Sequence, residues 1–239
     1  MTRPTRSTDR VPSVHCGVAV GAARADTLDP RHMSHDPEPA AGAEVAEDPY
    51  ARLDPEVRAR REAALRHVRK YGDPVLKTRA REIERFDAAL RDEIERMGRL
   101  MNDALGIGLA ATQVGILNRV LVYRVSSEGA IAALVNPVLE WSSRDEEPLD
   151  EGCLSLPGVL VEVDRPIHVR VRAQDEHGDP LLIEASGLEA RVIQHEMDHL
   201  DGVLILERTS RDQRKQAMRA MREAMAAGRT PPDSSAVSA

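Results

Sequence analysis

The 239-residue sequence predicts an α+β fold in which mostly antiparallel β-sheets pack around a central helix, with further helices at the N- and C-terminal ends. Two observations predict it. The middle of the chain contains β-branched and aliphatic runs separated by short polar turns, at residues 119–125, 131–135, 159–163, 167–173 and 181–184. Apolar residues on either side of this region recur at helical rather than strand spacing.

The chain is expected to hold one folded domain over residues 49–226. Residues 1–48 show no sustained period of 2 or 3.6, so we interpret them as a disordered or wrongly assigned N-terminal extension, with Met33 as an alternative start. A targeting peptide is the less favoured reading, because the stretch 14–23 is only weakly apolar. Residues 227–239, rich in Pro and Ser, are expected to form a disordered tail.

Four helices are expected. The first begins where Asp54 precedes Pro55 and extends to about Lys70, because a capping residue followed by Pro opens a helix. The second follows Asp87, and its apolar stripe faces the core. The third covers residues 187–200 and ends before Asp201-Gly202, and the last covers about 212–226.

Composition and charge exclude several classes of protein. No apolar run approaches the roughly 20 residues that span a bilayer, so no membrane partner is expected. The net charge of −7 disfavours a DNA-binding protein, and an aromatic content of 2% disfavours base stacking. Of the two cysteines, Cys16 lies in the irregular N-terminal part, so a structural disulfide is not expected and a reducing, cytoplasmic location fits.

The strongest local signal is the stretch His195-Glu196-Met197-Asp198-His199. Residues four apart share one face of a helix, so both imidazoles can reach one metal ion, with Glu196 beside them as a candidate base. The alternative interpretation is that these residues form an ordinary polar helix surface that binds no metal. The helix is otherwise apolar, so a metal site is the better interpretation.

The third metal ligand decides among the hydrolases that share this pattern. One large metalloprotease group needs a histidine where this chain has Ile205. Another uses a downstream glutamate, for which Glu207 or Glu223 could be nominated, but both lie in surroundings typical of a helix surface. Cys153, in a Gly- and Pro-punctuated segment expected to form a tight loop at a sheet edge, is the better candidate. Two His and one Cys leave a coordination position open, as in catalytic sites.

A segment rich in glycine and alanine, residues 106–115, follows the second helix. Its small residues let another backbone approach closely. It is not a phosphate-binding loop, because it lacks the Gly-Lys-Ser/Thr ending. Taken alone it is weak evidence.

Together, three segments resemble the peptide deformylase family: residues 106–113 match G-x-G-x-A-A-x-Q, residues 151–155 match E-G-C-x-S, and residues 194–199 match Q-H-E-x-D-H. The resemblance covers roughly Tyr71 to Met221. It implies a hydrolase that removes the formyl group from the N-terminal formylmethionine of nascent polypeptides and releases formate.

The resemblance also implies roles for individual residues. Cys153, His195 and His199 would be the metal ligands and Glu196 the general acid and base. The side chain of Gln113 and the backbone N–H of Leu154 would donate hydrogen bonds to the formyl oxygen. The residues expected to shape the substrate pocket are Gly106, Gly108, Leu149 and Glu151.

This chain departs from some relatives, which carry an Arg shortly after the Cys motif, where it has Val159 and Leu160. Contacts to the substrate backbone are therefore left open by the resemblance. Asp198 is expected to form a structural salt bridge, with Arg165 as the partner, rather than to bind metal.

One divalent metal ion per chain is expected, and His and Cys ligands accept Fe, Zn, Ni and Co. The resemblance implies Fe(II) in cells, with Zn, Ni or Co in purified protein. The resemblance implies two partners, N-formylmethionyl peptides and the ribosome. The ribosome would be contacted through the basic stretch 208–222. The alternative interpretation of this stretch is a helix face exposed to solvent. A zinc endopeptidase and a non-catalytic metal-stabilised binding module are the competing functions.

Overall fold

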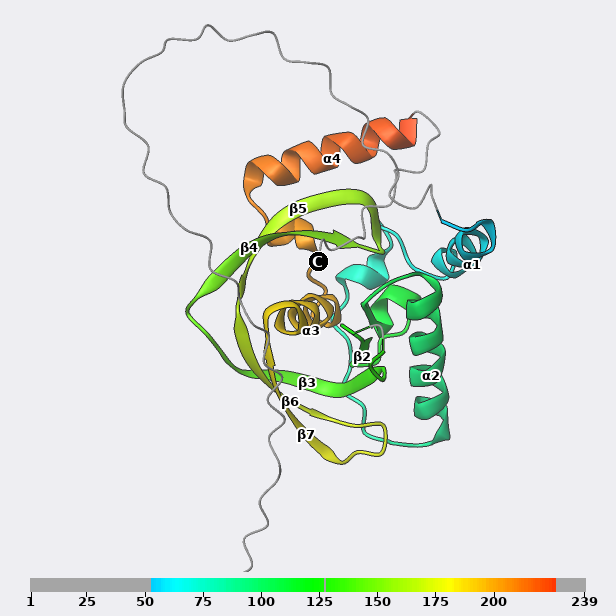
Figure 1. Cartoon of the computed structure of the whole chain (residues 1–239), viewed down its shortest axis with the longest axis vertical. Coiled ribbons are helices and arrows are strands. Elements are labelled where there is room, and N and C mark those ends of the chain that lie inside the picture. Colours follow the sequence, from blue (N-terminus) through cyan, green and yellow to red (C-terminus); the bar gives the residue numbers. More distant parts are fainter. Residues whose placement is uncertain (1–52, 127, 227–239) are drawn as a thin grey trace, which may run out of the picture. The chain divides into compact units, whose positions relative to one another are not determined.

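A computed structural model describes residues 53–126 and 128–226, and within them the predicted α+β class is confirmed (Figure 1). The expectations for residues 1–48 and 227–239 lie outside the described residues. All named strand pairs are antiparallel. The elements are α1 (Pro55–Leu65), η1 (Pro74–Lys77), α2 (Ala88–Asp103), β1 (Gly108–Ala110), η2 (Ala111–Val114), β2 (Val120–Tyr123), β3 (Ala132–Ser142), β4 (Glu146–Cys153), β5 (Leu156–Pro166), β6 (His168–Gln174), β7 (Pro180–Ser186), α3 (Gly187–Leu200), η3 (Ile205–Glu207) and α4 (Arg211–Ala226).

The strands form a five-stranded sheet in the order β1-β2-β3-β6-β7 and a separate two-stranded sheet, β4-β5. In Figure 1 the helix α3 lies between these two sheets. One hydrophobic cluster fills the space between α3 and the five-stranded sheet, where Ile193 of the helix and Leu121 of β2 are fully buried. Because α3 carries buried residues over most of its length, it packs between the sheets rather than on the surface.

Two further clusters attach the remaining elements. Met97 and Met101 of α2 pack with Val120 and Val122 of β2. The third cluster joins the β4-β5 hairpin to η1, η3 and α4, with Met221 as the buried residue of α4. These packings place α2 beside the five-stranded sheet and α4 beside the hairpin.

The first helix is shorter than predicted. Asp54 caps it as expected, accepting a hydrogen bond from the Glu56 backbone N–H at 2.8 Å, but the helix ends at Leu65 rather than near Lys70. The following backbone pairs with distant segments instead. Arg69 N–H donates to the Gln113 carbonyl at 2.7 Å and Tyr71 N–H to the Ser155 carbonyl at 2.9 Å. These bonds replace the helical ones that would have extended α1.

The third strand is longer than predicted, because β3 continues past Val135 to Ser142. Asn136 adopts a left-handed conformation (φ 52°) and Pro137 follows it, a combination that is typical of a strand end. The strand resumes after a register shift opposite β6. Asn136 tolerates this conformation because its side chain accepts a hydrogen bond from the Ile83 N–H and donates one to the Ile83 carbonyl.

The Cys153 segment is a β-hairpin and not the predicted loop at a sheet edge. Cys153 is the last residue of β4, and β5 starts at Leu156 after a shift in register between Gly152 and Cys153. The alternating burial along β5 keeps Val161 and Val163 in the core, so the hairpin has an inner face. That inner face carries Glu151 and Cys153, both buried.

Among the described residues, no helix has the length and apolar character needed to cross a membrane.

Candidate metal centre and active site

The helix α3 presents the two histidines to the same point. His195 and His199 are one turn apart, and their ring centroids lie 5.0 Å from each other with an interplanar angle of 68°. His199 is fully buried, and its carbonyl accepts a hydrogen bond from the Thr112 hydroxyl of η2 at 3.1 Å. The predicted helix therefore brings the two imidazoles together as its spacing required.

The β4-β5 hairpin supplies the cysteine. Cys153 Sγ lies 3.2 Å from His199 Nε2, and one possible ligand atom from each of Cys153, His195 and His199 falls within 4.8 Å of the others. A tetrahedral metal with bonds of about 2.0–2.3 Å spaces its ligand atoms roughly 3.5 Å apart. A thiol and two imidazoles in this compact arrangement fit one metal ion with a position left open.

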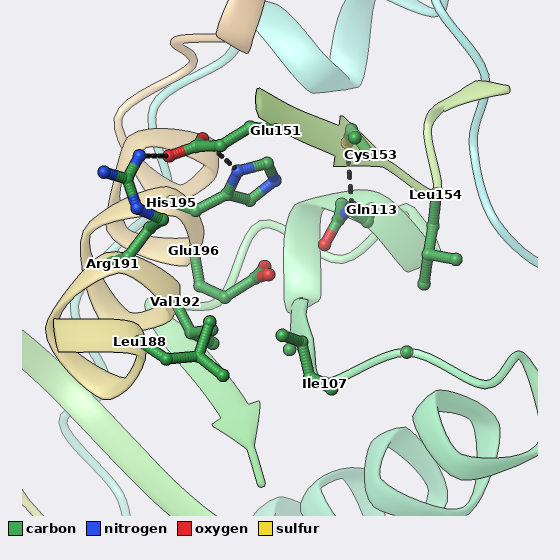
Figure 2. A pocket seen from close by; sticks show the side chains of 13 residues that line it. Ile107, Gln113, Glu151, Cys153, Leu154, Leu188, Arg191, Val192, His195 and Glu196 are labelled. Carbon is green, nitrogen blue, oxygen red and sulfur yellow. Dashed lines mark hydrogen bonds and ion pairs between the residues drawn. The ribbon is translucent and has the colours of Figure 1, made fainter. Parts of the chain in front are cut away.

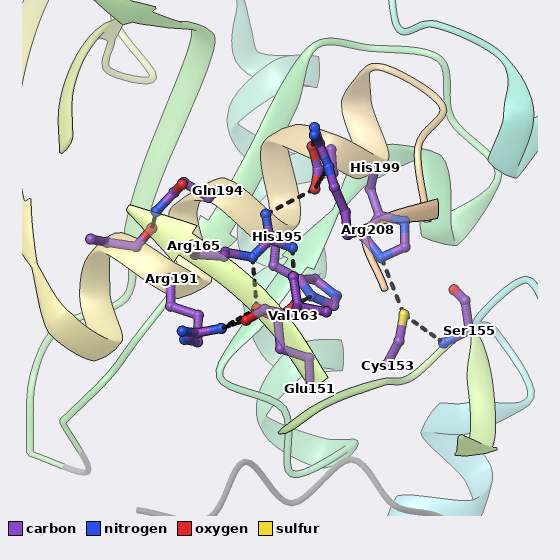
Figure 3. A network of polar contacts seen from close by, with 12 residues as sticks. Glu151, Cys153, Ser155, Val163, Arg165, Arg191, Gln194, His195, His199 and Arg208 are labelled. Atoms are coloured by element: carbon purple, nitrogen blue, oxygen red, sulfur yellow. Dashed lines mark hydrogen bonds and ion pairs between the residues drawn. The ribbon is translucent and has the colours of Figure 1, made fainter. Parts of the chain in front are cut away.

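His195 is oriented by a buried carboxylate. Its Nδ1 lies 3.0 Å from Glu151 Oε2, which leaves Nε2 for a metal (Figure 3). Glu151 also accepts hydrogen bonds from Arg165, from Nε at 2.6 Å and from Nη2 at 2.9 Å, and from Arg191 Nη1 at 2.8 Å. Four donors thus occupy the four acceptor positions of the carboxylate. Glu151 holds protein groups and has no acceptor left for a substrate.

The predicted salt bridge between Asp198 and Arg165 is confirmed. Arg165 Nη1 donates to Asp198 Oδ2 at 2.9 Å, and Arg208 Nε reaches the same oxygen at 3.0 Å. Arg165 therefore links the carboxylate that orients His195 to the carboxylate beside His199. Arg165 and Glu151 are almost completely buried, with 4% and 2% exposure, so the ion pairs are shielded from water.

The electrostatics of the group favour charged forms of the thiol and imidazole. Burial would raise the pKa of Cys153, but the neighbouring His199 and His195 hold that pKa well below its usual range. Burial would lower the pKa of His195, and hydrogen bonds with Cys153 and Glu151 instead raise it well above the usual value. Burial would raise the pKa of Glu151, but the hydrogen bonds from His195 and Arg165 outweigh burial and hold that pKa far below its usual range. A thiolate is the form of cysteine that binds metals.

Glu196 lies in the same cavity with one carboxylate oxygen uncommitted. The side chain is buried, and its Oε2 has no hydrogen-bond partner in the described part of the chain. Burial raises the pKa of Glu196, with Cys153 acting in the same direction and the two histidines opposing it. A buried carboxylate with an unused oxygen and a raised pKa is suited to accept and return a proton.

Gly108 makes room for that carboxylate. A Cβ atom at this position would lie 2.4 Å from Glu196 Oε1 and 2.9 Å from Cδ. Because such contacts are not tolerated, any larger residue at position 108 must displace Glu196. At Gly106 the nearest atom is Cδ1 of Leu154, at 3.0 Å from an added Cβ. The two glycines thus allow close approach, but of the Glu196 and Leu154 side chains rather than of another backbone, as the sequence had predicted for segment 106–115.

Gln113 is aimed at the cysteine. Its Oε1 accepts a hydrogen bond from the Ala110 N–H at 2.8 Å, which fixes the amide so that Nε2 faces Cys153 Sγ at 3.7 Å and Ser155 Oγ at 3.3 Å (Figure 2). The side chain is 1% exposed. The short helix η2 and strand β1, which the sequence had left as a possible loop, therefore hold a buried donor in the cavity.

The cavity has about 50 Å³ of free volume. Figure 2 shows side chains of α3, η2 and the hairpin converging on it. The residues that line it are Gly106, Ile107, Gly108, Gln113, Glu151, Gly152, Cys153, Leu154, Leu188, Arg191, Val192, His195 and Glu196.

Leu149 is the predicted pocket residue that is not among those lining the cavity. It lies in β4 opposite Val163, two residues before Glu151 along the strand. Leu188 and Val192, which the sequence gave only as apolar residues of the helix, pack with the core cluster and also line the cavity. The signal was present, because residues 188, 192, 195 and 199 follow helical spacing on the side of α3 that carries the histidines. Ile107 and Arg191 were also missed, and Arg191 had no local signal because its role depends on Glu151.

Comparison with known proteins identifies the family. The family model for polypeptide deformylase matches residues 65–215. The chain is 47% identical over 167 residues to the peptide deformylase of Acidothermus cellulolyticus, covering 70% of this chain and 91% of that protein. It is 48% identical over 161 residues to peptide deformylase 1 of Corynebacterium glutamicum, covering 66% and 95%.

Solved structures agree. The peptide deformylase from Synechococcus elongatus in complex with actinonin has a TM-score of 0.62 and 40% identity, with 68% of this chain and 88% of that chain covered. The peptide deformylase from Thermus thermophilus has a TM-score of 0.63 and 40% identity, with 67% and 95% covered. The chain therefore belongs to the peptide deformylase family, the metal-dependent hydrolases that remove the N-formyl group from nascent polypeptides.

Proposed function

We propose that Cys153, His195 and His199 hold the single metal ion of this deformylase, with Glu196 as the group that moves the proton. The observation that carries the proposal is the compact cluster of one sulfur and two imidazoles beside a buried carboxylate oxygen without a partner. When bound, the metal supplies Lewis-acid chemistry that makes a water molecule nucleophilic near neutral pH.

Glu196 takes the proton of the attacking water on its carboxylate and returns it to the amine nitrogen as the C–N bond of the formamide breaks. Its burial and raised pKa support this role, because a carboxylate in water would hold the proton too weakly. Water adds to the formyl carbon, and the products are formate and a free amino terminus, so the atoms of one water molecule are divided between the two.

Gln113 Nε2 and the Leu154 backbone N–H donate to the formyl oxygen, which gains negative charge as water adds. The orientation of the Gln113 amide toward Cys153 supports this role, since it is fixed by the Ala110 N–H before any substrate arrives. A donor placed in advance contributes about 3–4 kcal/mol to lowering the barrier. Lys70 Nζ donates to the Leu154 carbonyl at 2.8 Å and so holds the hairpin turn in place.

The methionine side chain of the substrate enters the apolar part of the cavity, formed by Ile107, Leu188 and Val192 with Gly106 and Gly108. Leu149 has no place in this proposal, since it does not line the cavity. Glu151 acts as a positioning residue for His195 rather than as a group that touches substrate.

The metal is proposed to be Fe(II), in a reducing cytoplasm. The support is the donor set, because one thiolate with two imidazoles accepts Fe(II), and Zn, Ni and Co as well. Anaerobically purified protein is expected to contain Fe, with faster formate release than the Zn-loaded form. Equal rates for both metals, with Zn in the anaerobic preparation, would contradict the choice of iron.

The decisive experiment measures formate released from a formyl-methionyl peptide by wild type and by Glu196→Gln, which keeps the shape but cannot accept the proton. The expected loss is at least about 100-fold in kcat with the metal content unchanged. Wild-type rates in the metal-loaded variant would overturn the role of Glu196.

Cys153→Ser is expected to lose metal. Cleavage of internal peptide bonds that survives Cys153→Ser would instead favour a zinc endopeptidase.

Contact with the ribosome is proposed for α4. This helix is attached through Met218 and Met221, while Arg211, Arg214, Lys215, Arg219 and Arg222 are exposed. Exposed cations along one helix favour contact with RNA phosphates. Replacing Arg214, Lys215 and Arg222 by Gln is expected to weaken co-sedimentation with ribosomes at low salt. Unchanged co-sedimentation would leave α4 as a solvated helix.

A further inference from the structure

A second basic surface lies on the other helices, between α1 and α2. This groove of about 920 Å³, called here the α1–α2 groove, is separate from the catalytic cavity, with which it shares no lining residue. Its residues are Arg60, Ala63, Ala64, Arg66, His67, Val68, Arg69, Lys70, Asp73, Arg96, Met97, Arg99, Leu100, Asp103, Val114 and Ile116.

The groove is strongly cationic in a chain whose net charge is −7. Six of its lining residues are Arg or Lys and two are Asp. Some of these charges are already used, since Arg99 pairs with Glu95 and Lys70 donates to the Leu154 carbonyl. Arg69 pairs with Asp73 at 3.7 Å. Within residues 53–126 and 128–226, Arg60 and Arg66 make no salt bridge, and Arg96 makes none but interacts electrostatically with Glu93. These three are therefore available to an external anion.

The lining favours a phosphate backbone over stacked bases. Between the cations the groove is aliphatic, with Ala63, Ala64 and Leu100 along the facing sides of the two helices. No Phe, Tyr or Trp lines it, so the flat platforms that hold unpaired bases are missing from this surface. Double-stranded RNA is recognised mostly by its shape and its phosphates, which needs cations and no aromatic platform.

The neighbouring hollow of about 260 Å³ does not continue this basic surface. It adjoins the groove at the acidic residue Asp73, and its Lys77 is paired with Glu207. The cations that can contact an external phosphate backbone from this side therefore lie in the α1–α2 groove itself.

We propose that the α1–α2 groove binds the phosphate backbone of double-stranded RNA. Arg60, Arg66 and Arg96 make the contacts, and the groove acts independently of α4 and of the deformylase reaction. For an enzyme whose substrates are nascent polypeptides, RNA helices exposed on the ribosome are the source of such a backbone.

The test uses the full chain and a fluorescein-labelled 20-base-pair RNA duplex, with binding followed by anisotropy between 50 and 200 mM salt. Neutralising Arg60, Arg66 and Arg96 together to Gln is expected to weaken binding at 100 mM salt at least about tenfold. The slope of log K against log salt should fall in magnitude by about 2 to 3, since each lost phosphate contact removes roughly 0.9. Each single variant should remove about one third of this, which keeps the test open if the triple variant folds poorly.

The matched control replaces Arg85, Arg144 and Arg170, three exposed arginines outside both basic surfaces, by Gln. It removes the same charge and is expected to change the slope by less than about 0.5, because distant charges are screened. Equal losses in the two triple variants, or no binding by wild type at 50 mM salt, would overturn the proposal. So would competition by polyglutamate at the same charge concentration as effectively as by unlabelled duplex, which would indicate an acidic protein partner.

Formate release separates this proposal from the proposed chemistry. The groove residues do not line the catalytic cavity, so the groove variants are expected to release formate from a formyl-methionyl peptide at the wild-type rate. Groove variants that lose RNA binding but release formate at the wild-type rate would support the groove proposal independently of the proposed chemistry. If Glu196→Gln kept the wild-type rate of formate release, the proposed role of Glu196 would be wrong, and the RNA-binding result would still stand.

Discussion

Gly108 and Glu196 illustrate how a residue without a side chain takes part in a catalytic site. The carboxylate of Glu196 occupies the space that a Cβ of residue 108 would need, at 2.4 Å from Oε1. Glu196 is buried and lines the cavity, so an added Cβ would push its carboxylate out of its present position. The position of the proposed proton-moving group thus depends on the absence of one methyl group.

Gly108→Ala is therefore expected to lower kcat for formate release about 100-fold, because a displacement of about 1 Å of a reacting group costs on this order. Metal content, measured by atomic absorption, should stay at the wild-type level. The matched control is Gly129→Ala, where an added Cβ meets only ordinary contacts at 3.4 Å. A Gly108→Ala enzyme with wild-type kcat would contradict the account of this contact.

Lys70 provides a pH-dependent contribution to stability at a single residue. Burial lowers the pKa of its ammonium group to about 8, with Arg61 acting in the same direction and Cys153 opposing it. The unfolded chain keeps a lysine pKa of about 10.4 and so binds more protons than the native state between these values. The free energy of unfolding therefore rises with pH from about 8 to 10.4, and this contribution is lost as pH falls to 8.

Replacing Lys70 by Met is expected to remove that pH dependence. Urea unfolding at pH 7.5, 8.5 and 9.5 should show wild type gaining stability relative to Lys70→Met as pH rises. Lys77→Met replaces a lysine whose side chain is exposed to water; it serves as the control and should track wild type over this range. The opposite trend, a wild-type advantage that shrinks with rising pH, would show that the ammonium is favoured by the fold.

At the scale of elements, Asn136 decides how β3 continues. Its left-handed backbone interrupts the strand, while its side chain accepts from the Ile83 N–H at 2.8 Å and donates to the Ile83 carbonyl at 2.9 Å. A third bond of 3.0 Å reaches Gln174 Oε1 in β6. One side chain therefore ties the segment before α2 to two strands of the sheet.

Asn136→Ala is expected to lower the free energy of unfolding by about 2–4 kcal/mol. The loss combines the hydrogen bonds to Ile83 with the strain of a left-handed alanine. Gln174→Ala removes the third bond together with the 3.3 Å bond from Gln174 Nε2 to the Gly178 carbonyl, and is expected to cost about 1 kcal/mol. Chemical denaturation of both variants in the same metal-loaded state measures the difference. Equal losses would place the stabilisation in the Gln174 contact rather than in the Ile83 pair.

The elements differ in how far local sequence predicted them. The helix α3 has the predicted bounds, because its apolar period and its Ser-Gly and Asp-Gly ends are local signals. The helix α1 and the strand β3 were given wrong ends, because distant hydrogen bonds at Arg69 and Asn136 decide where they stop or continue. Within the β4-β5 hairpin, the run 159–163 was correctly predicted as strand, but the segment 151–158 was predicted as a loop because its glycines and prolines gave a turn signal where strand pairing extends almost to the turn.

At the scale of the whole molecule, the three proposed metal ligands come from two elements, the helix α3 between the sheets and the β4-β5 hairpin. His195 and His199 lie on α3, and Cys153 lies at the end of β4. A metal bound at this cluster binds the native state and not the unfolded chain, which lacks the assembled site. The metal is therefore expected to stabilise the contact between α3 and the β4-β5 hairpin.

Removing the metal by chelation should lower the Tm of wild type. At metal concentrations of 100 times Kd, binding contributes about 2.7 kcal/mol, which corresponds to a shift of several degrees for a domain of this size. Differential scanning fluorimetry of the chelated and reloaded protein measures it. Cys153→Ser is the control and should show a smaller shift. An unchanged wild-type Tm on metal removal would contradict a site that exists only in the folded chain.

The sequence by itself indicated the family and the residues proposed as metal donors. Helical spacing places His195 and His199 on one face, and the motifs around Gln113 and Cys153 narrow the class of hydrolase. These are local signals, carried by a few adjacent residues. They were therefore available without any knowledge of the fold.

Only the tertiary structure decided what surrounds the donors. The bonds of Glu151 to Arg165, Arg191 and His195 join residues 14 to 44 positions apart, and the Lys70 bond to Leu154 spans 84 positions. No periodicity encodes such pairs, because they depend on how α3, the hairpin and the segment after α1 come together. The same is true of the α1–α2 groove, whose cations come from separate helices and form one surface only after those helices pack.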